Sequence, residues 1–280
     1  MTPSPFTLAT CQSLITPDAR VNGAHLRDLM RRAHAAGARL AHFPEGALTG
    51  YAKHQIQDWS AVDWDAVREE FEAVAALAGA LGLWTVVGGA HPLTPPHWPH
   101  NSLYVISDAG QLVGRYDKRR LSQTEVSRFY TPGFEPLVFE VDGWHFGCAI
   151  CVEVVFPDVF AEYERLGVDA LLLSMYVDLP DRRLLSRAHA ATNGYWLSLA
   201  NAADCAHALP TEVFGPDGEP LKTAPREEVP AVLVTTLDPQ TPDFHVPINL
   251  ARPWRRKALA GDLYTERRVD DERSRDRLTF

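Results

Sequence analysis

The stretch "LVFEVDGWHFGCAICVEVVFPDVFAEYERLGVDALLLS", residues 137–174, decides the fold class, because strand and helix patterns alternate along it. "LVFEV" and "WHFGCAIC" predict two strands that form a hairpin around Asp142 and Gly143, a strong two-residue turn signal. Apolar residues at helical spacing then predict a helix that ends at Gly167. The near-continuous apolar run "DALLLS" is typical of a strand covered on both faces. This order of elements indicates a mixed sheet with helices packed outside it.

The same alternation continues on both sides of this stretch. Helical spacing predicts helices over residues 24–36, 64–81 and 181–193, and β-rich runs separate them. Residues 73–90 carry no charge and reach the lower length limit of a membrane span. The amphipathic pattern before them and a glycine at position 82 that suits a C-cap indicate instead a helix followed by a buried strand. We therefore expect a layered α/β fold with no membrane partner.

Composition excludes several classes of protein. A chain of 280 residues suits one large domain or two small ones, and 46% hydrophobic residues can form a sizeable core. The formal net charge of −9 argues against a nucleic-acid partner, which would need a concentrated basic surface. Four cysteines are too few for a disulfide scaffold, so we expect reduced thiols and a cytoplasmic location. Two early prolines and no basic stretch before an apolar run argue against a signal peptide.

Cys148 and Cys151 lie three positions apart and leave three alternatives open: a metal or redox pair, two core thiols, or one reactive thiol. Side chains three apart on a strand point to opposite faces, and a zinc site would need further ligands, which disfavours a pair. Cys148 lies within its strand and is expected to be buried and inert. Cys151 comes at the C-terminal end of that strand, where reactive groups gather in α/β folds. As a nucleophile, it would need a base to take its proton.

Two further ionisable residues lie at predicted strand ends. In "AHFPEGALTGY", residues 41–51, Pro44 ends a strand and the glycine after Glu45 permits a sharp exit. In "GRYDKRRL", residues 114–121, Lys118 follows another strand. Either charge alone is explained at least as well by an exposed turn. A carboxylate, an ammonium and a thiol together make a workable hydrolytic set, because the carboxylate can act as base and acid while the ammonium stabilises an oxyanion.

These three stretches, in this order, resemble the glutamate, lysine and cysteine blocks of the carbon–nitrogen hydrolases of the nitrilase superfamily. The blocks read "FPEGALTGY", "GRYDKRRL" and "GCAICVEVVFPD", and "SRAHAATNGYWLSLANAA", "GPDGEPL" and "RPWRRKALAGDLY" are further likenesses. The resemblance covers about residues 5–265. It implies a four-layer α-β-β-α sandwich with mixed sheets, whose subunits pair through an extended C-terminal arm. We expect one domain over 1–265 that includes the arm, then a charged, partly disordered tail over 266–280.

The resemblance also implies roles for particular residues. Glu45, Lys118 and Cys151 correspond to the family's catalytic triad. Glu125, in "TEVSRFYTPG", corresponds to a second glutamate that often belongs to the site; the alternative is an exposed loop charge. The backbone N–H of Val152 would help Lys118 to bind the oxyanion. A small amide, ω-amide or carbamoyl compound would form a thioester on Cys151 and release ammonia or an amine, with no metal or organic cofactor.

Some expectations stay open at this stage. Tyr51 and Tyr176 fall where the family lines its substrate pocket, but packing in the core explains either aromatic about as well. Many family amidases have tyrosine or asparagine, and nitrile-cleaving members tryptophan, where this chain has Val152. That difference weakens the alternative of nitrile hydrolysis. N-acyl transfer and a catalytically silent interaction protein remain alternatives, and a homodimer or higher homo-oligomer is expected.

Three histidines in the loop "HPLTPPHWPH", at positions 91, 97 and 100, could suggest a metal site. The prolines stiffen this segment, and nothing in its sequence sets a ligand geometry. We therefore expect a surface loop and no metal site.

Overall fold

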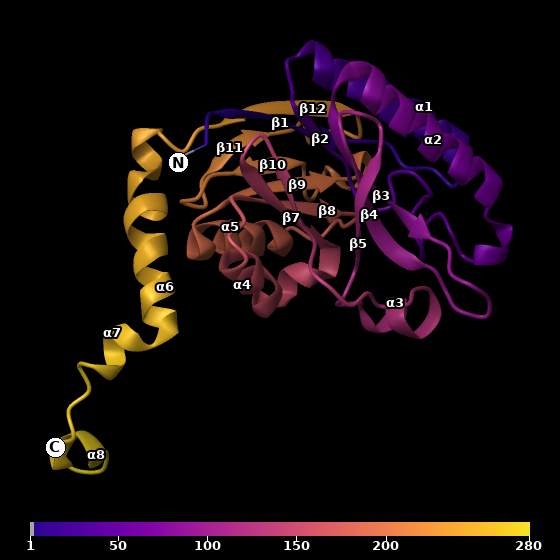
Figure 1. Cartoon of the computed structure of the whole chain (residues 1–280). Coiled ribbons are helices and arrows are strands. Elements are labelled where there is room, and N and C mark those ends of the chain that lie inside the picture. Colours follow the sequence, from indigo (N-terminus) through magenta and orange to yellow (C-terminus); the bar gives the residue numbers. More distant parts are fainter. Residues whose placement is uncertain (1–2) are drawn as a thin grey trace.

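The computed structural model describes residues 3–280, apart from the side chain at position 262. Within this range, two six-stranded sheets lie face to face and helices cover both outer sides, as Figure 1 shows. Each sheet contains parallel and antiparallel strand pairs. The fold is therefore the four-layer α-β-β-α sandwich with mixed sheets that the sequence predicted.

The first sheet has the strand order β12-β1-β2-β3-β4-β5. Its strands are β1 (Phe6–Gln12), β2 (Leu40–His42), β3 (Trp84–His91), β4 (His100–Ile106), β5 (Leu112–Asp117) and β12 (Ala231–Leu237). The strands β1, β2 and β3 run parallel, so that their C-terminal ends lie at the same edge of the sheet. Glu45 follows β2 at this edge.

The second sheet has the order β11-β10-β9-β8-β7-β6. Its strands are β6 (Val138–Val141), β7 (Trp144–Ile150), β8 (Ala170–Met175), β9 (Trp196–Asn201), β10 (Glu212–Phe214) and β11 (Pro220–Thr223). The predicted hairpin joins β6 to β7. Asp142 and Gly143 have φ angles of 52° and 82°, the left-handed values that a tight two-residue turn requires. The strands β7, β8 and β9 are parallel, and their C-terminal ends carry Cys151, Tyr176 and the loop after Asn201.

Helices α1 (Ala19–Ala35) and α2 (Trp64–Leu81) cover the first sheet, while α4 (Pro157–Arg165) and α5 (Asp181–Asn193) cover the second (Figure 1). The predicted bounds of α2 and α5 are confirmed. The first helix begins earlier than predicted, because the Asp18 carboxylate accepts hydrogen bonds from the N–H groups of Arg20 and Val21 and so caps it. In the described range, no helix is both long and apolar enough to cross a bilayer.

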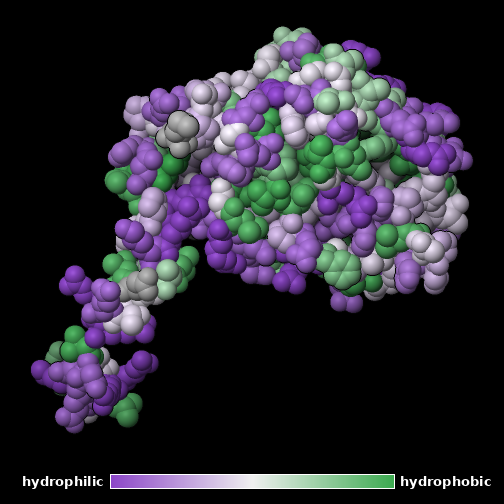
Figure 2. All heavy atoms as spheres, in the orientation of Figure 1, coloured by the Kyte–Doolittle hydropathy of each residue, from purple (hydrophilic) through white to green (hydrophobic). Residues whose placement is uncertain are grey.

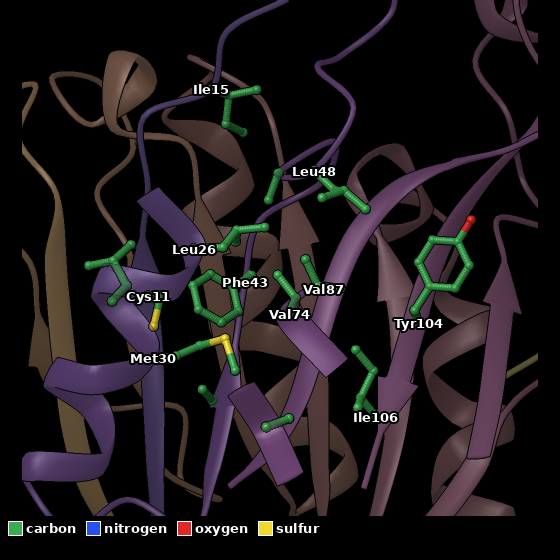
Figure 3. Close-up of a cluster of buried hydrophobic side chains, with 14 of the residues drawn as sticks. Cys11, Ile15, Leu26, Met30, Phe43, Leu48, Val74, Val87, Tyr104 and Ile106 are labelled. Atoms are coloured by element: carbon green, nitrogen blue, oxygen red, sulfur yellow. The ribbon is translucent and has the colours of Figure 1, made fainter. Parts of the chain in front are cut away.

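Apolar side chains fill the space on both sides of each sheet. Figure 3 shows the layer between α1, α2 and the first sheet, where Leu26, Met30, Phe43 and Val74 meet. A second cluster lies between the two sheets, and a third packs α4 and α5 onto the second sheet. Burial of each such side chain contributes about 1.5–3 kcal/mol, so these layers hold the strand ends in place.

A chain of buried polar groups joins the two sheets within the sandwich. His42 on β2 contacts the hydroxyl groups of Ser198 on β9 and Ser174 on β8 at 2.8 Å each, and Ser198 also contacts Thr10 on β1 at 2.7 Å. Burial lowers the pKa of His42 to about 3, so the imidazole is neutral. These bonds fix how the edge that carries Glu45 faces the edge that carries Tyr176.

The C-terminal segment leaves the sandwich as an arm (Figure 1). Its elements are a π-helical segment (His245–Ala251), α6 (Arg252–Ala260), α7 (Asp262–Thr265) and α8 (Glu272–Arg275). The guanidinium groups of Arg252 and Arg256 hold it to the Glu164 carboxylate of α4 at 3.2 and 2.6 Å. The sequence predicted an arm here without helices of its own, whereas the arm is largely helical. The expected disorder of residues 266–280 stays a prediction.

Candidate active site

The Glu45 carboxylate is fully buried and accepts hydrogen bonds on both oxygens. Its Oε1 accepts from Nδ2 of Asn101 at 2.7 Å and from Nζ of Lys118 at 2.9 Å. Its Oε2 accepts from the backbone N–H of Tyr176 at 3.0 Å. The segment before Glu45 passes so close to β3 that a Cβ atom at Gly88 would lie 2.2 Å from a carbonyl oxygen of that segment. Glycine at this position therefore lets the strand end place Glu45 in the interior.

Lys118 follows β5, and its side chain is also fully buried, not on an exposed face. Besides its contact with Glu45, its Nζ lies 2.7 Å from Oε1 of Glu125. Glu125 lies in the first turn of α3 (Gln123–Arg128), where it forms a capping box with Ser122. Because this helix start fixes the carboxylate, Glu125 is a buried partner of Lys118 and not an exposed loop charge.

Cys151 directly follows β7 and begins a 3₁₀ turn, η2 (Cys151–Val155). Its φ angle of 50° lies in the left-handed region, which non-glycine residues adopt at a cost of about 1–3 kcal/mol. The thiol lies near enough to Glu45, Lys118 and Glu125 that each charge shifts its pKa. Cys148 lies within β7, fully buried, as expected of a core thiol.

Glu153, two residues after Cys151, joins the segments that carry the thiol and the ammonium. Its buried carboxylate accepts hydrogen bonds from the N–H of Ile150 at 2.8 Å and from the Tyr116 hydroxyl at 2.7 Å. It also accepts from the N–H of Arg119 at 2.9 Å, next to Lys118 in the chain. The end of β5 and the end of β7 are thereby held together, although they belong to different sheets.

Burial and mutual charge decide the proton positions in this cluster. Burial raises the pKa of Glu45; Lys118 opposes this effect and Glu125 adds to it. Burial and the Glu45 charge raise the pKa of the Cys151 thiol. Burial disfavours the Lys118 ammonium, but both carboxylates outweigh it and hold the pKa of Lys118 well above its ordinary value. The same ammonium outweighs burial at Glu125 and lowers the pKa of Glu125 to about 2. The cluster therefore holds a neutral thiol beside a carboxylate whose basicity is increased.

A cavity of about 430 Å³ borders Cys151, a size typical of small-molecule sites. Its walls include Glu125, Val152, Tyr51 and Tyr176. The two tyrosine rings stack with their centroids 4.8 Å apart. The structure therefore places Val152, Tyr51 and Tyr176 around this cavity, while Lys118 and Glu45 lie fully buried behind its lining residues. Chemically, the arrangement combines a thiol, a buried base and an ammonium beside a space for a small molecule.

Several residues of the site were missed from the sequence. Asn101 donates a hydrogen bond to Glu45, 56 positions away, and Gln55 donates one to Tyr176, 121 positions away. Asp204 borders the cavity and accepts a hydrogen bond from the Tyr176 hydroxyl. None of these residues belongs to a local motif, so no pattern in the sequence could have identified them.

The predicted surface loop is shorter than expected, because two of its three histidines lie on strands. His91 ends β3 and His100 begins β4, and their Nδ1 atoms bond to the Tyr104 hydroxyl at 3.1 Å and the Thr131 carbonyl at 2.8 Å. Over the part of the chain that the structure describes, no group of three or more His, Cys, Asp or Glu side chains is arranged to hold a metal ion.

The family model described as carbon-nitrogen hydrolase matches residues 7–242. A hydrolase of Mycobacterium tuberculosis is 28% identical over 233 residues, which cover 74% of this chain and 80% of the relative. An omega-amidase of Xenopus tropicalis is 23% identical over 71% of this chain and 75% of its own length.

Solved structures resemble this fold over nearly the whole chain. A variant of the amidase from Nesterenkonia sp. AN1 in complex with butyramide superposes with a TM-score of 0.75. The two sequences are 22% identical, and the match covers 92% of this chain and 96% of the amidase. This likeness establishes the nitrilase-superfamily fold.

Proposed function

Because this chain belongs to the carbon-nitrogen hydrolase family, we propose that it is a thiol hydrolase that cleaves the carbon–nitrogen bond of a small amide, ω-amide or carbamoyl compound. The observation that carries this proposal is the buried ion cluster beside Cys151, in which Lys118 bridges Glu45 and Glu125. A purely structural role does not account for three charged groups buried next to Cys151, since well-packed apolar residues of similar volume often stabilise an interior as well as a buried ion pair does.

The first step forms a covalent intermediate. Glu45 takes the proton of the Cys151 thiol, and the sulfur attacks the carbonyl carbon of the amide. Negative charge then develops on the carbonyl oxygen, where the Lys118 ammonium and the N–H of Val152 stabilise it. Glu45 returns the proton to the nitrogen, the carbon–nitrogen bond breaks, and ammonia or an amine leaves a thioester on Cys151.

The second step regenerates the thiol. Glu45 takes a proton from a water molecule, the resulting oxygen attacks the thioester carbon, and the carbon–sulfur bond breaks. The proton returns to the Cys151 sulfur and the carboxylic acid leaves. Glu125 keeps the ammonium of Lys118 in position through both steps, because it is bonded to Nζ and fixed by α3.

The relatives support an amide as substrate. In a glutamate-to-glutamine variant of the Nesterenkonia amidase, the acetamide moiety of fluoroacetamide is added covalently to the active-site cysteine. Two further relatives are a deaminated glutathione amidase of Bos taurus and the omega-amidase of Xenopus tropicalis. From these relatives we infer that this chain also cleaves an amide and that Cys151 is its nucleophile.

We also propose that the chain forms a homodimer through its C-terminal arm. Trp254, Leu259 and Leu263 are exposed apolar residues on the arm, and Figure 2 shows hydrophobic and hydrophilic residues mixed along it. A second copy would cover these side chains. All four cysteines are free, which supports a reducing compartment such as the cytoplasm.

A substrate panel tests the reaction. Purified protein is incubated with butyramide, glutaramate, N-carbamoyl-β-alanine and butyronitrile, and ammonia and the free acid are measured. We expect acid and ammonia from at least one amide or carbamoyl compound and none from the nitrile. Added hydroxylamine separates hydrolysis from acyl transfer, because a transferase would form product only with an acceptor. Release of ammonia and acid from the nitrile alone, or from no member of the panel, would overturn the proposal.

A further inference from the structure

Asp204 borders the same cavity as Cys151 and lies in the 3₁₀ turn η3 (Ala203–Cys205), which one residue separates from the end of β9. Its Oδ2 accepts a hydrogen bond from the hydroxyl of Tyr176, which in turn accepts one from Nε2 of Gln55 at 2.8 Å. Its Oδ1 is buried and has no hydrogen-bond partner among the described residues. Buried carboxylate oxygens are almost always bonded, so this oxygen is an acceptor to which no described residue donates.

The surroundings of Asp204 are negatively charged. The carboxylate of Asp178 borders the same part of the cavity and is exposed. Burial, and after it the negative charges of Asp204 and Asp178, raise the pKa of the Cys205 thiol to about 12. This end of the cavity therefore favours a positively charged group over a negatively charged one.

The cationic side chains that border the cavity already have partners. Nζ of Lys53 donates to Oγ of Ser122 at 3.1 Å, and its charge helps to lower the pKa of Glu125. Nη1 of Arg182 lies 2.8 Å from a carboxylate oxygen of Asp181. Neither cation is bonded to Asp204, so no ion pair among the described residues occupies this carboxylate.

We propose that Asp204, with Asp178 beside it, binds a protonated amine of the substrate. The preferred substrates are then short amides with a terminal ammonium group. Neutral amides and amides with a terminal carboxylate of the same length are poorer substrates. This inference rests on the proposed amide hydrolysis at Cys151, and it names the substrate class.

The sheet gives the spacing between the two ends of such a substrate. The strand β9, which precedes Asp204, lies two positions from β7, which precedes Cys151. Neighbouring strands lie about 4.8 Å apart, so the two strand ends are separated by about 10 Å. A chain of a few methylene groups fits between an amide at Cys151 and an ammonium at Asp204. The stacked rings of Tyr51 and Tyr176 offer it an apolar wall.

Matched substrates and one conservative variant test the inference. kcat/KM is measured for 5-aminopentanamide, pentanamide and glutaramate with the unmodified protein, with Asp204→Asn and with Asp28→Asn. Asp28 lies on α1 and is 67% exposed, so its change removes the same charge far from the cavity. A charge-assisted hydrogen bond predicts that the ammonium substrate is preferred over pentanamide by about 10- to 100-fold. Asp204→Asn should reduce the ratio of the two kcat/KM values to within about threefold of one, whereas Asp28→Asn should retain the preference.

A binding measurement separates this inference from the proposed reaction. Calorimetric titration of Cys151→Ala with 5-aminopentanamide and with pentanamide needs no turnover. We expect tighter binding of the ammonium compound, and loss of the difference in the double variant with Asp204→Asn. If no amide is hydrolysed but this difference is seen, the reaction is wrong and the ammonium site stands. Equal binding of both compounds, or a preference for glutaramate in the kinetic test, would overturn the site.

Discussion

Nζ of Lys118 lies 2.9 Å from Oε1 of Glu45, although 73 positions separate the two residues in the chain. Both side chains are fully buried, and Glu125 binds the same ammonium from α3. Two carboxylates share one ammonium, so the cluster carries an excess negative charge away from water. Such an arrangement lowers the stability of the fold, and ionisable groups perturbed in this way are typical of functional sites, which is why the proposed chemistry is assigned to this place.

Cys148 lies within β7 and Cys151 directly after it, and the two should behave differently when each is changed to alanine. Cys151→Ala removes the nucleophile and should reduce kcat by at least about 10³-fold without loss of the folded state. Cys148→Ala removes a buried thiol that contacts no part of the cavity, and should keep most of the activity while lowering stability by about 1 kcal/mol. Steady-state kinetics and thermal unfolding measure both. Loss of activity in Cys148→Ala at unchanged stability would revive the paired-thiol alternative.

Glu125→Gln should move the pH dependence of the reaction. The negative charge of Glu125 raises the pKa of Glu45, in addition to the effect of burial, while Lys118 lowers it. Removal of that charge should lower the pKa of Glu45. Since Glu45 must be deprotonated to act as base, the acid limb of the pH profile of kcat/KM should shift to lower pH. Glu135→Gln, at an exposed position, is the control and should leave the limb in place. A limb that moves upward in Glu125→Gln would contradict the assignment of Glu45 as base.

Glu153→Gln should weaken both the fold and the reaction. Glutamine would present an amide N–H₂ to donors such as the N–H of Ile150 and the Tyr116 hydroxyl, and would leave one of them unpaired. We expect a loss of about 1–3 kcal/mol in the free energy of unfolding, measured in urea. A lower kcat should accompany it, because the ends of β5 and β7 lose their link. Glu140→Gln, with a side chain 63% exposed, should change neither quantity. Unchanged stability and kcat in Glu153→Gln would show that this carboxylate does not position the site.

Leu259→Asp tests the proposed dimer. The side chain is 74% exposed on α6, and in a dimer it would be covered by the second copy. A carboxylate buried there without a partner should raise the dimer dissociation constant by at least about tenfold. Light scattering after size exclusion, over a range of concentrations, measures this constant. Leu278→Asp, at a 96% exposed position in the tail, should have no effect. A monomer before any substitution, or a dimer that Leu259→Asp leaves unchanged, would contradict the proposal.

The elements of the fold and the strand ends that carry Glu45, Lys118 and Cys151 could be predicted because their signals are local. A proline stops the strand before Glu45, and the turn at Asp142 and Gly143 needs only the residues that form it. The start of the first helix was misplaced because the cap at Asp18 lies before the apolar pattern.

The remaining parts depend on contacts between distant segments. Asn101 reaches Glu45, and His42 reaches Ser198 across 156 positions. Asp204 belongs to the site only because the fold places it beside Tyr176 and the cavity. Such pairings depend on how the two sheets face one another, and no local pattern in a single sequence predicts that arrangement. The helical form of the arm was missed because its anchors, Arg252 and Arg256, bind a residue on α4.

The most direct test of the central claim is to capture the acyl-enzyme. The protein is mixed with an amide that it hydrolyses and quenched in acid within the first turnover, and intact and peptide masses are then measured. Our account predicts one added acyl group, carried by the peptide that contains Cys151, and no adduct in Cys151→Ala. Hydrolysis that proceeds with no acylated protein, or with the acyl group on another residue, would contradict it.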